Sequence, residues 1–194
     1  MTGGASHGAR RTPHGPAGFT LVEFLVVMAV IVVISTIAVP VFSSYYEECC
    51  LTAAVAEIAG MIKEAKQRAL IDEKYYALGF DPVACRVSLI AAKGRDGKWN
   101  SADDQVVRSF RLADKGGGLT FGYGGHGPIS GLAKDPDGVT FQSNNTLVCN
   151  ADLTGSAGAV YLITRRGAAM ALTMNSSDFG YTLYQWNGKK WVRI

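Results

Sequence analysis

The stretch Gly18-Phe19-Thr20-Leu21-Val22-Glu23 opens an apolar run that continues to Phe42. From residue 21 to residue 42 the only charged side chain is that of Glu23. At the rise of an α-helix, this run would be roughly 33 Å long, which is enough to cross a hydrocarbon core of about 30 Å. The run therefore predicts one transmembrane helix.

The segment ahead of the apolar run carries Arg10 and Arg11 and no acidic residue. By the positive-inside rule, such a flank stays in the cytoplasm and the chain beyond Phe42 is exported. A secretory signal peptide is the alternative, but its apolar region usually spans only about 7 to 15 residues and ends at a small-residue cleavage site. No Ala-x-Ala follows Phe42, so the sequence favours a membrane anchor.

Glu23 lies close to one end of the predicted span. A carboxylate in a membrane helix costs about 2.5 to 3.5 kcal/mol at the bilayer centre and less near an interface, so such a residue is usually paired or functional. The alternative is that its side chain simply extends to the cytoplasmic headgroups.

The sequence GFTLVEFLVVMAVIVVISTIAVPVF, residues 18–42, resembles the N-terminal signal of type IV pilins and type II secretion pseudopilins. The resemblance rests on a glycine, an aromatic residue, Thr-Leu and a glutamate at fixed spacing ahead of an apolar helix. It implies cleavage by a prepilin peptidase between Gly18 and Phe19, and N-methylation of Phe19. It also implies that Glu23 pairs with the α-amine of Phe19 on a neighbouring subunit.

The same resemblance implies a non-enzymatic subunit that assembles by helix packing into a type II secretion pseudopilus or a type IV pilus. The expected partners are other pilin or pseudopilin subunits, the prepilin peptidase, the inner-membrane assembly platform and membrane lipid. The expected location is the bacterial inner membrane, crossed once with the head in the periplasm, and then the filament. Pro40 should kink the helix rather than end it, and a proline at this spacing is common in the family.

A second helical pattern follows the anchor. Apolar residues recur with the 3.6-residue period between Leu51 and Ala69, and charged residues take the opposite face. We therefore expect a helix from about Phe19 to about Ile71. Beyond Asp72, short β-type segments alternate with Gly-rich connections. The predicted fold is α+β, with a long N-terminal helix, transmembrane in its first half, packed by its second half on a C-terminal antiparallel β-sheet head.

This reading divides the chain into a leader at 1–18, a transmembrane and assembly helix at 19–42, its amphipathic continuation at 43–72 and a β-rich periplasmic head at 73–194. Turns are expected at Asn187-Gly188, which suits a type I′ hairpin, and at Arg166-Gly167. The Gly-rich stretch 115–138 is expected to be an extended surface loop. The expected strands are Tyr75–Phe80, Cys85–Ala91, Gln105–Leu112, Leu119–Tyr123, Val139–Gln142, Thr146–Cys149, Ala159–Thr164, Ala168–Thr173, Tyr181–Trp186 and Lys190–Arg193.

The order of these strands, together with Val139-Thr-Phe-Gln, the segment 158–167 and the terminal Tyr-Thr-Leu-Tyr-Gln-Trp, resembles the GspH/FimT branch of minor pilins. The net charge does not indicate any particular partner. Removing the two arginines of the leader lowers it from +3 to +1, which is not the strongly basic balance of a dedicated nucleic-acid-binding protein. The sequence shows no set of residues that would form a catalytic site. Two of the three histidines lie in the leader, and His126 lies by itself in the Gly-rich stretch.

Four oxygen-bearing side chains gather in one loop: Asp96, Asn100, Asp103 and Asp104. Such ligands are a candidate Ca²⁺ site, and the stretch also looks like the calcium loop of major pseudopilins. Against a metal, the spacing does not match an EF-hand, and Arg95 and Lys98 would oppose a cation. An acidic, solvated hairpin loop is the competing interpretation, and the sequence indicates no certain cofactor.

Basic residues cluster late in the chain, at Arg165, Arg166, Lys189 and Lys190, with Trp186 and Trp191 near them. A basic and aromatic surface of this kind can contact DNA, as FimT-like competence pilins do. The alternative function is therefore a membrane-anchored protein that binds DNA or an exported substrate through this patch. The competing interpretation is a set of charged strand edges that prevent aggregation.

The four cysteines form two sets. Cys85 and Cys149 are candidates for a disulfide in an exported domain, and two small buried residues are the alternative. Cys49 and Cys50 are neighbours in the predicted helix and cannot easily bridge each other, so packing is the simpler expectation.

Overall fold

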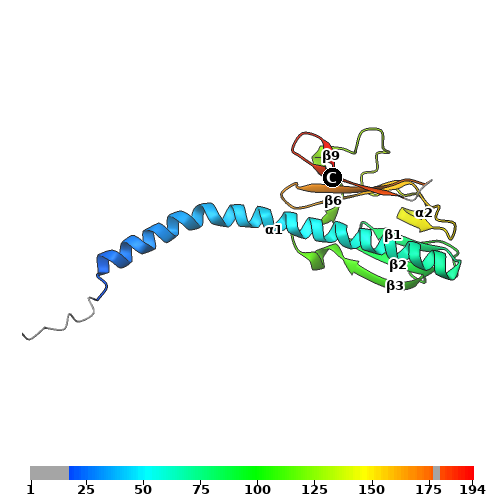
Figure 1. Ribbon diagram of the computed structural model, residues 1–194, viewed down its shortest axis with the longest axis horizontal. Coiled ribbons are helices and arrows are strands. Elements are labelled where there is room, and N and C mark those ends of the chain that lie inside the picture. Colours follow the sequence, from blue (N-terminus) through cyan, green and yellow to red (C-terminus); the bar gives the residue numbers. More distant parts are fainter. Residues whose placement is uncertain (1–17, 177–179) are drawn as a thin grey trace, which may run out of the picture. The chain divides into compact units, whose positions relative to one another are not determined.

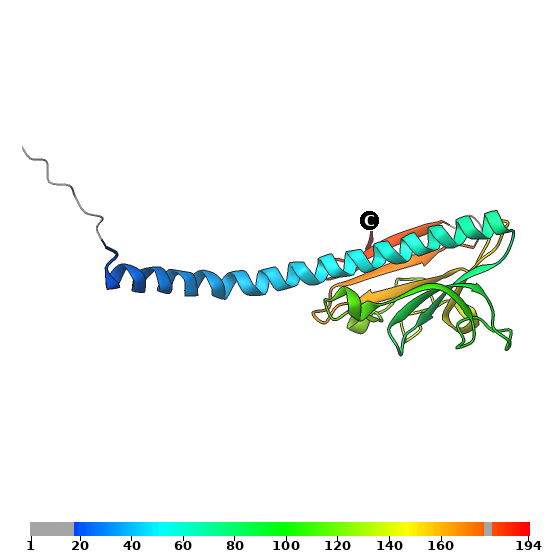
Figure 2. The same ribbon diagram turned by 90° about the horizontal axis from the view of Figure 1, so that it is seen from below.

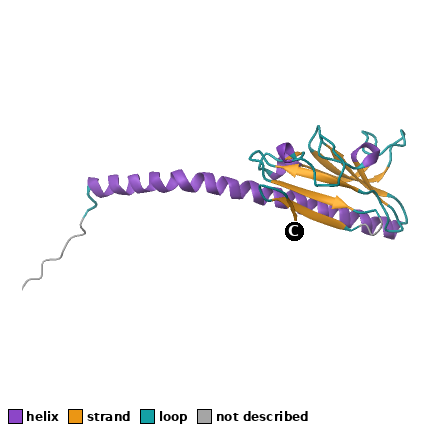
Figure 3. Ribbon diagram, turned by 90° about the horizontal axis from the view of Figure 1, so that it is seen from above, coloured by secondary structure: helices purple, strands orange, loops and turns teal. Residues whose placement is uncertain are grey.

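The computed structural model describes residues 18–176 and 180–194. The described residues divide into two units, one that ends at Val41 and one that starts at Phe42. The helix α1 (Leu21–Asp72) begins in the first unit and continues into the second. It is 52 residues long and contains Pro40. Figure 3 draws it in purple as a continuous helix. The predicted long helix is therefore confirmed, with bounds that agree within two residues.

In the first unit, the described residues of α1 are exposed around the whole circumference of the helix. A helix that is apolar on all sides suits lipid or other helices rather than water. By length and composition, α1 contains a stretch able to cross a membrane.

The second unit is built on two antiparallel sheets (Figure 1). Sheet A has the order β3-β2-β1-β5, and sheet B has the order β4-β6-β7-β8-β9. The strands of sheet A are β1 (Tyr76–Asp81), β2 (Arg86–Ala92), β3 (Gln105–Arg111) and β5 (Thr146–Cys149). Those of sheet B are β4 (Thr120–Phe121), β6 (Gly158–Ile163), β7 (Ala169–Met174), β8 (Tyr181–Trp186) and β9 (Trp191–Arg193). Short helical turns occupy η1 (Leu112–Lys115), η2 (Gly124–His126) and α2 (Gln142–Asn145).

Figure 2 shows the C-terminal part of α1 lying along the strands of the second unit. One hydrophobic core joins this part of α1 to both sheets. Leu51, Ile58 and Ile62 of α1 are almost completely buried in it, as the 3.6-residue period predicts. Each such side chain contributes about 1.5 to 3 kcal/mol when it leaves water. Charged residues of α1 flank this core, and Arg108 of β3 approaches Glu64 to 3.0 Å. Because both side chains are partly exposed, this pair adds at most about 1 kcal/mol.

Nine of the ten expected strands are present among the described residues, with bounds shifted by one or two residues at several ends. The exception is 139–142, where Val139 makes only an isolated bridge to Val160. The chain turns there because Phe141 is buried in the core and stacks on Phe80, at a centroid distance of 5.6 Å.

One expectation about connections is wrong, that of a type I′ turn at Asn187-Gly188. Gly188 has a φ of +91°, but Asn187 is not among the described residues with positive φ, so the turn is not type I′. Instead, the Asn187 side chain accepts hydrogen bonds from the amides of Lys189 and Lys190.

The Gly-rich stretch 115–138 is mostly a surface loop, as expected, interrupted by β4 and η2. It lies against sheet B through the pairing of β4 with β6. The amide of Ile129 donates to the hydroxyl of Tyr161 over 3.1 Å, and the indole of Trp191 donates to the carbonyl of Gly127 over 3.0 Å. The polar ends of two aromatic side chains, the buried Tyr161 and the partly buried Trp191, thus hold this segment in place.

Candidate functional site

The start of α1 is closed by a reciprocal pair of hydrogen bonds. The Thr20 amide donates to Glu23 Oε2 over 3.0 Å, and the Glu23 amide donates to Thr20 Oγ1 over 3.2 Å. The Thr20 carbonyl accepts the first helical bond from the Phe24 amide. This is a capping box, which satisfies two backbone donors that a helix start leaves without partners. The Thr-x-x-Glu spacing is a known signature of that motif, and our sequence reading missed it.

The predicted processing residues lie just before this cap. Gly18 and Phe19 precede the helix, and the Phe19 side chain is 84% exposed. The bond between them is thus outside regular secondary structure, where a peptidase can bind an extended chain. Residues 1–17 of the predicted leader, with Arg10 and Arg11, lie outside the described residues. The structure places the Glu23 carboxylate at the same end of α1 as Phe19, engaged by Thr20 of its own chain.

The four basic residues of the predicted patch come together at one end of sheet B. Arg165 and Arg166 lie in the turn between β6 and β7, and Lys189 and Lys190 lie in the turn between β8 and β9. Both turns are at the same end because Met170 pairs with Gln185 in adjacent strands. All four side chains are exposed. We call this surface the basic end.

Arg166 connects the basic end to α1. Its guanidinium donates to Ser44 Oγ over 2.7 Å and lies 3.5 Å from the carboxylate of Glu47. The Arg166 amide also donates to Glu47 over 3.2 Å. A hollow of about 680 Å³ opens beside this contact. His126 lines this hollow. Its ring stacks on Trp186 with 4.5 Å between the centroids, and its Nε2 lies 2.7 Å from the carbonyl oxygen of Gly167. These contacts give the one histidine of the head a structural role.

Three of the four predicted metal ligands lie together. Carboxylate oxygens of Asp96, Asp103 and Asp104 are all within 4.8 Å of one another. Backbone amides of the same loop donate to them, including those of Arg95 and Lys98. The Ser101 hydroxyl and the Arg95 amide lower the pKa of Asp103. These hydrogen bonds explain how three carboxylates can lie close together in one loop. Ca²⁺ binding stays a prediction.

Asn100 is not brought into that cluster. Its amide group donates to the carbonyls of Phe80 and Asn144, over 2.9 and 3.1 Å. In return, the Asn144 amide group donates to the carbonyls of Trp99 and Asn100. Asn100 and Asn144 both have left-handed backbones, with φ of +59° and +63°, a conformation that asparagine tolerates better than most residues. The loop that contains Asn100 is therefore hydrogen-bonded both to β1 and to the segment that contains Asn144. We call these four hydrogen bonds the clasp.

The predicted disulfide between Cys85 and Cys149 is wrong. Both cysteines are free, and they lie at opposite ends of β1. Cys149 stands opposite Tyr76 at the start of that strand, whereas Cys85 precedes Arg86, which pairs with Asp81 at its end. Five residues of strand separate these ends by about 16 Å, and cysteines with Cα atoms more than about 7 Å apart cannot bridge. Burial raises the pKa of Cys149 to about 12.

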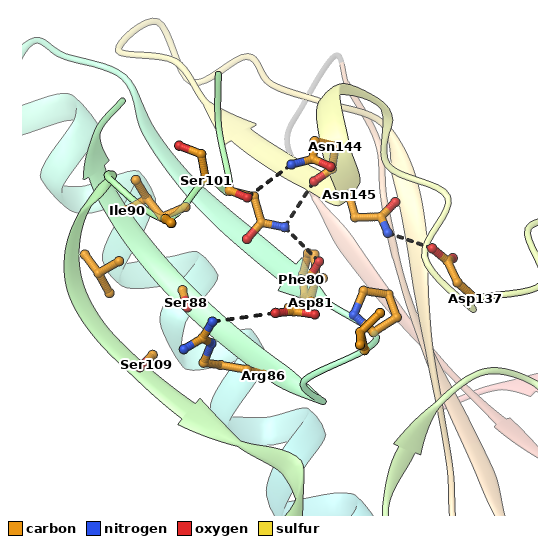
Figure 4. A pocket seen from close by; sticks show the side chains of 15 residues that line it. Phe80, Asp81, Arg86, Ser88, Ile90, Ser101, Ser109, Asp137, Asn144 and Asn145 are labelled. Atoms are coloured by element: carbon orange, nitrogen blue, oxygen red, sulfur yellow. Dashed lines mark hydrogen bonds and ion pairs between the residues drawn. The ribbon is translucent and has the colours of Figure 1, made fainter. Parts of the chain in front are cut away.

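The structure also holds a polar hollow of about 750 Å³ that the sequence reading did not foresee (Figure 4). Ser88 and Ser109, opposite each other on β2 and β3, line it. Asp81 and Arg86 face each other on one side, 3.5 Å apart (Figure 4). Short side chains at matching register positions leave this space, and register is not visible in one unaligned sequence.

Residues 14–39 match the family model of the prokaryotic N-terminal methylation motif. The chain therefore carries a prokaryotic N-terminal methylation motif that spans Gly18, Phe19 and Glu23. No protein of curated function matches the sequence. Among solved structures, the chain is similar to the minor pseudopilin EpsH from the type 2 secretion system of Vibrio cholerae, with 10% identity and a TM-score of 0.45. That match covers 69% of this chain and 94% of the EpsH chain.

Proposed function

We propose that this pilin-type chain is a minor pilin or pseudopilin, processed by a prepilin peptidase and assembled by helix packing into a type II secretion pseudopilus or a type IV pilus. The observation that supports it is the match of residues 14–39 to the methylation motif, at the start of a helix that is apolar on all sides. Proteins of this superfamily act as structural subunits, and the work of such a subunit is mechanical.

The first half of α1 serves as the anchor and later as the assembly element. In the inner membrane, the exposed apolar side chains from Leu21 to Phe42 are solvated by lipid tails. In the filament, the same side chains pack against helices of neighbouring subunits, so one surface serves both states. The head, residues 73–194, faces the periplasm and then the outside of the filament. The α-amine of Phe19, freed by cleavage, is the cation that pairs with Glu23 of a neighbour.

The experiment that tests this proposal is the mass of the mature N-terminus. The chain is expressed with a matching prepilin peptidase, extracted from membranes and digested, and the N-terminal peptide is sequenced by mass spectrometry. We expect it to begin at Phe19 and to carry one methyl group. A Gly18→Trp variant is the control, since a large residue there should block cleavage. A wild-type chain that keeps its leader would contradict the proposal.

A second candidate function is DNA binding by the basic end. The observation that favours it is that the structure brings Arg165, Arg166, Lys189 and Lys190 to one end of sheet B, where all four are exposed. The test is a gel shift with the full chain in detergent. DNA binding requires an affinity in the micromolar range that weakens steeply with salt and is lost in the Arg165→Ala, Arg166→Ala double variant.

A further inference from the structure

Contacts between α1 and sheet B follow the same order along both elements. Arg166, just before β7, contacts Ser44 and Glu47. Further along, Thr52 lies 4.0 Å from the sulfur of Met170. Beyond it, the Lys63 ammonium lies 5.8 Å from the ring centroid of Tyr181 at the far end of the sheet. The basic end is therefore the end of the head that lies beside the first residues of α1 after the apolar run.

The residues that directly follow Phe42 indicate how deep the basic end lies relative to the membrane. Ser44 is two positions after Phe42, the last residue of the apolar run, and two residues advance about 3 Å along a helix. With residues 19–42 in the membrane as proposed above, a guanidinium bonded to Ser44 follows the end of the span directly along the chain, close to the lipid headgroups. Tyr45 and Tyr46 follow at once and are 66% and 50% exposed. Exposed aromatic residues at this position are typical of a membrane interface.

The charges at this end favour an anionic surface. Among the described residues, Glu47 is the acid that faces the basic end most closely, and Arg166 already pairs with it. Its side chain is only 13% exposed. In residues 18–176 and 180–194, no ion pair is formed by Arg165, Lys189 or Lys190. The other acid nearby, Glu48, is exposed and contributes one negative charge against the three positive charges of Arg165, Lys189 and Lys190.

We propose that the basic end is a membrane-docking surface, in which Arg165, Lys189 and Lys190 bind the headgroups of anionic phospholipids while the subunit is anchored. Arg166 is a positioning residue that fixes the β6–β7 turn against α1 at headgroup depth. This inference rests on the proposed anchoring of residues 19–42. It favours lipid over DNA as the partner, because a surface at headgroup depth is covered by the bilayer and hard for a duplex to reach.

The test uses the full chain in nanodiscs and amide hydrogen exchange read by mass spectrometry. One set of discs contains phosphatidylcholine alone, and the other contains equal parts of phosphatidylcholine and phosphatidylglycerol. We expect peptides that cover 164–168 and 187–191 to exchange severalfold more slowly in the anionic discs. This protection should vanish at about 1 M salt, where the Debye length is about 3 Å.

Two variants with equal loss of charge separate the basic end from net charge. Arg165→Gln, Lys189→Gln, Lys190→Gln should lose the protection, because each basic side chain near an anionic surface strengthens binding to it by roughly fivefold. Arg95→Gln, Lys98→Gln, Lys134→Gln removes three exposed cations elsewhere and should keep it. Loss of protection in both variants, or equal exchange in both kinds of disc, overturns the docking surface.

The remaining outcomes are distinct. Protection of the same turns by a DNA duplex, with no effect of phosphatidylglycerol, overturns lipid docking and assigns the surface to nucleic acid. A chain that does not enter the discs at all contradicts the proposed anchor. Insertion is measured separately, by co-purification of the chain with discs, so failure of the anchor and failure of the docking surface cannot be confused.

Discussion

Thr20 and Glu23 hold each other across the first turn of α1, through bonds of 3.0 and 3.2 Å between the backbone amide of each and the side chain of the other. The acid that the membrane-span argument singles out as needing a partner thus already has one in its own chain. Capping and intersubunit pairing are compatible, since a carboxylate accepts about four hydrogen bonds. They can be separated by substitution, because only the second needs a negative charge.

Glu23→Gln should therefore abolish assembly while leaving the helix start intact. Glutamine keeps the oxygen that a capping box uses but cannot form the ion pair with the amine of Phe19. We expect incorporation into filaments to fall about tenfold or more, which matches the loss of a charge-assisted hydrogen bond worth about 1.5 to 3 kcal/mol. Thr20→Ala is the matched control. It weakens the cap by about 1 kcal/mol and should assemble nearly normally. Normal assembly of Glu23→Gln would show that capping alone explains the acid.

The cysteines should react in an order set by burial. Cys49 is exposed, whereas Cys149 is 1% exposed and its pKa is about 12. At pH 8 the thiol of Cys149 stays protonated, and the thiolate is the reactive form. We expect iodoacetamide to modify Cys49 rapidly in the folded chain and to leave Cys149 unmodified. After unfolding without reductant, all four cysteines should react. A shortfall of two groups, restored by reductant, would reveal a disulfide that the geometry of β1 forbids.

The acidic loop should depend on pH with a predictable sign. The Ser101 hydroxyl and the Arg95 amide lower the pKa of Asp103 below its ordinary value of 3.8. A lowered pKa in the folded state stabilises the loop above pH 3.8, and that stabilisation is lost as the pH falls through the folded-state pKa. In a ¹³C NMR titration of the carboxyl groups, we expect Asp103 to have a midpoint below 3.8. Ser101→Ala should raise the midpoint, and an unchanged midpoint would contradict the hydrogen bonds seen here.

The long helix and nearly all the strands follow from local pattern, because burial repeats every 3.6 residues in α1 and turn residues separate the strands. The N-terminal motif was equally predictable, since it lies within one short segment; cleavage between Gly18 and Phe19 stays a prediction. What failed depended on distant parts of the chain. The bridge between Cys85 and Cys149 required knowing that β1 separates them, and the ligand role of Asn100 required knowing that β1 and α2 offer it carbonyls. Such pairings are set by strand register, which one sequence does not reveal.

Gly79 provides a direct test of the clasp between Asn100 and Asn144. A Cβ atom at position 79 would lie 2.4 Å from Asn100 Oδ1 and 2.7 Å from its Cγ. Gly79→Ala should therefore displace the Asn100 side chain and break its bonds to Phe80 and Asn144. We expect the free energy of unfolding, measured with urea in detergent, to fall by about 1 to 3 kcal/mol.

The matched control for Gly79→Ala is Asn100→Gly, because glycine accepts the φ of +59° at position 100 and has no side chain to collide with. That variant loses the clasp alone. In the double variant the collision with Asn100 is absent and only the 3.0 Å approach to the terminal methyl of Ile90 remains. The two losses should therefore not add, and the coupling energy should be about 0.5 to 3 kcal/mol. Strict additivity would mean that the new methyl group does not act through Asn100. The Asn100 side chain would then not be what requires glycine at position 79.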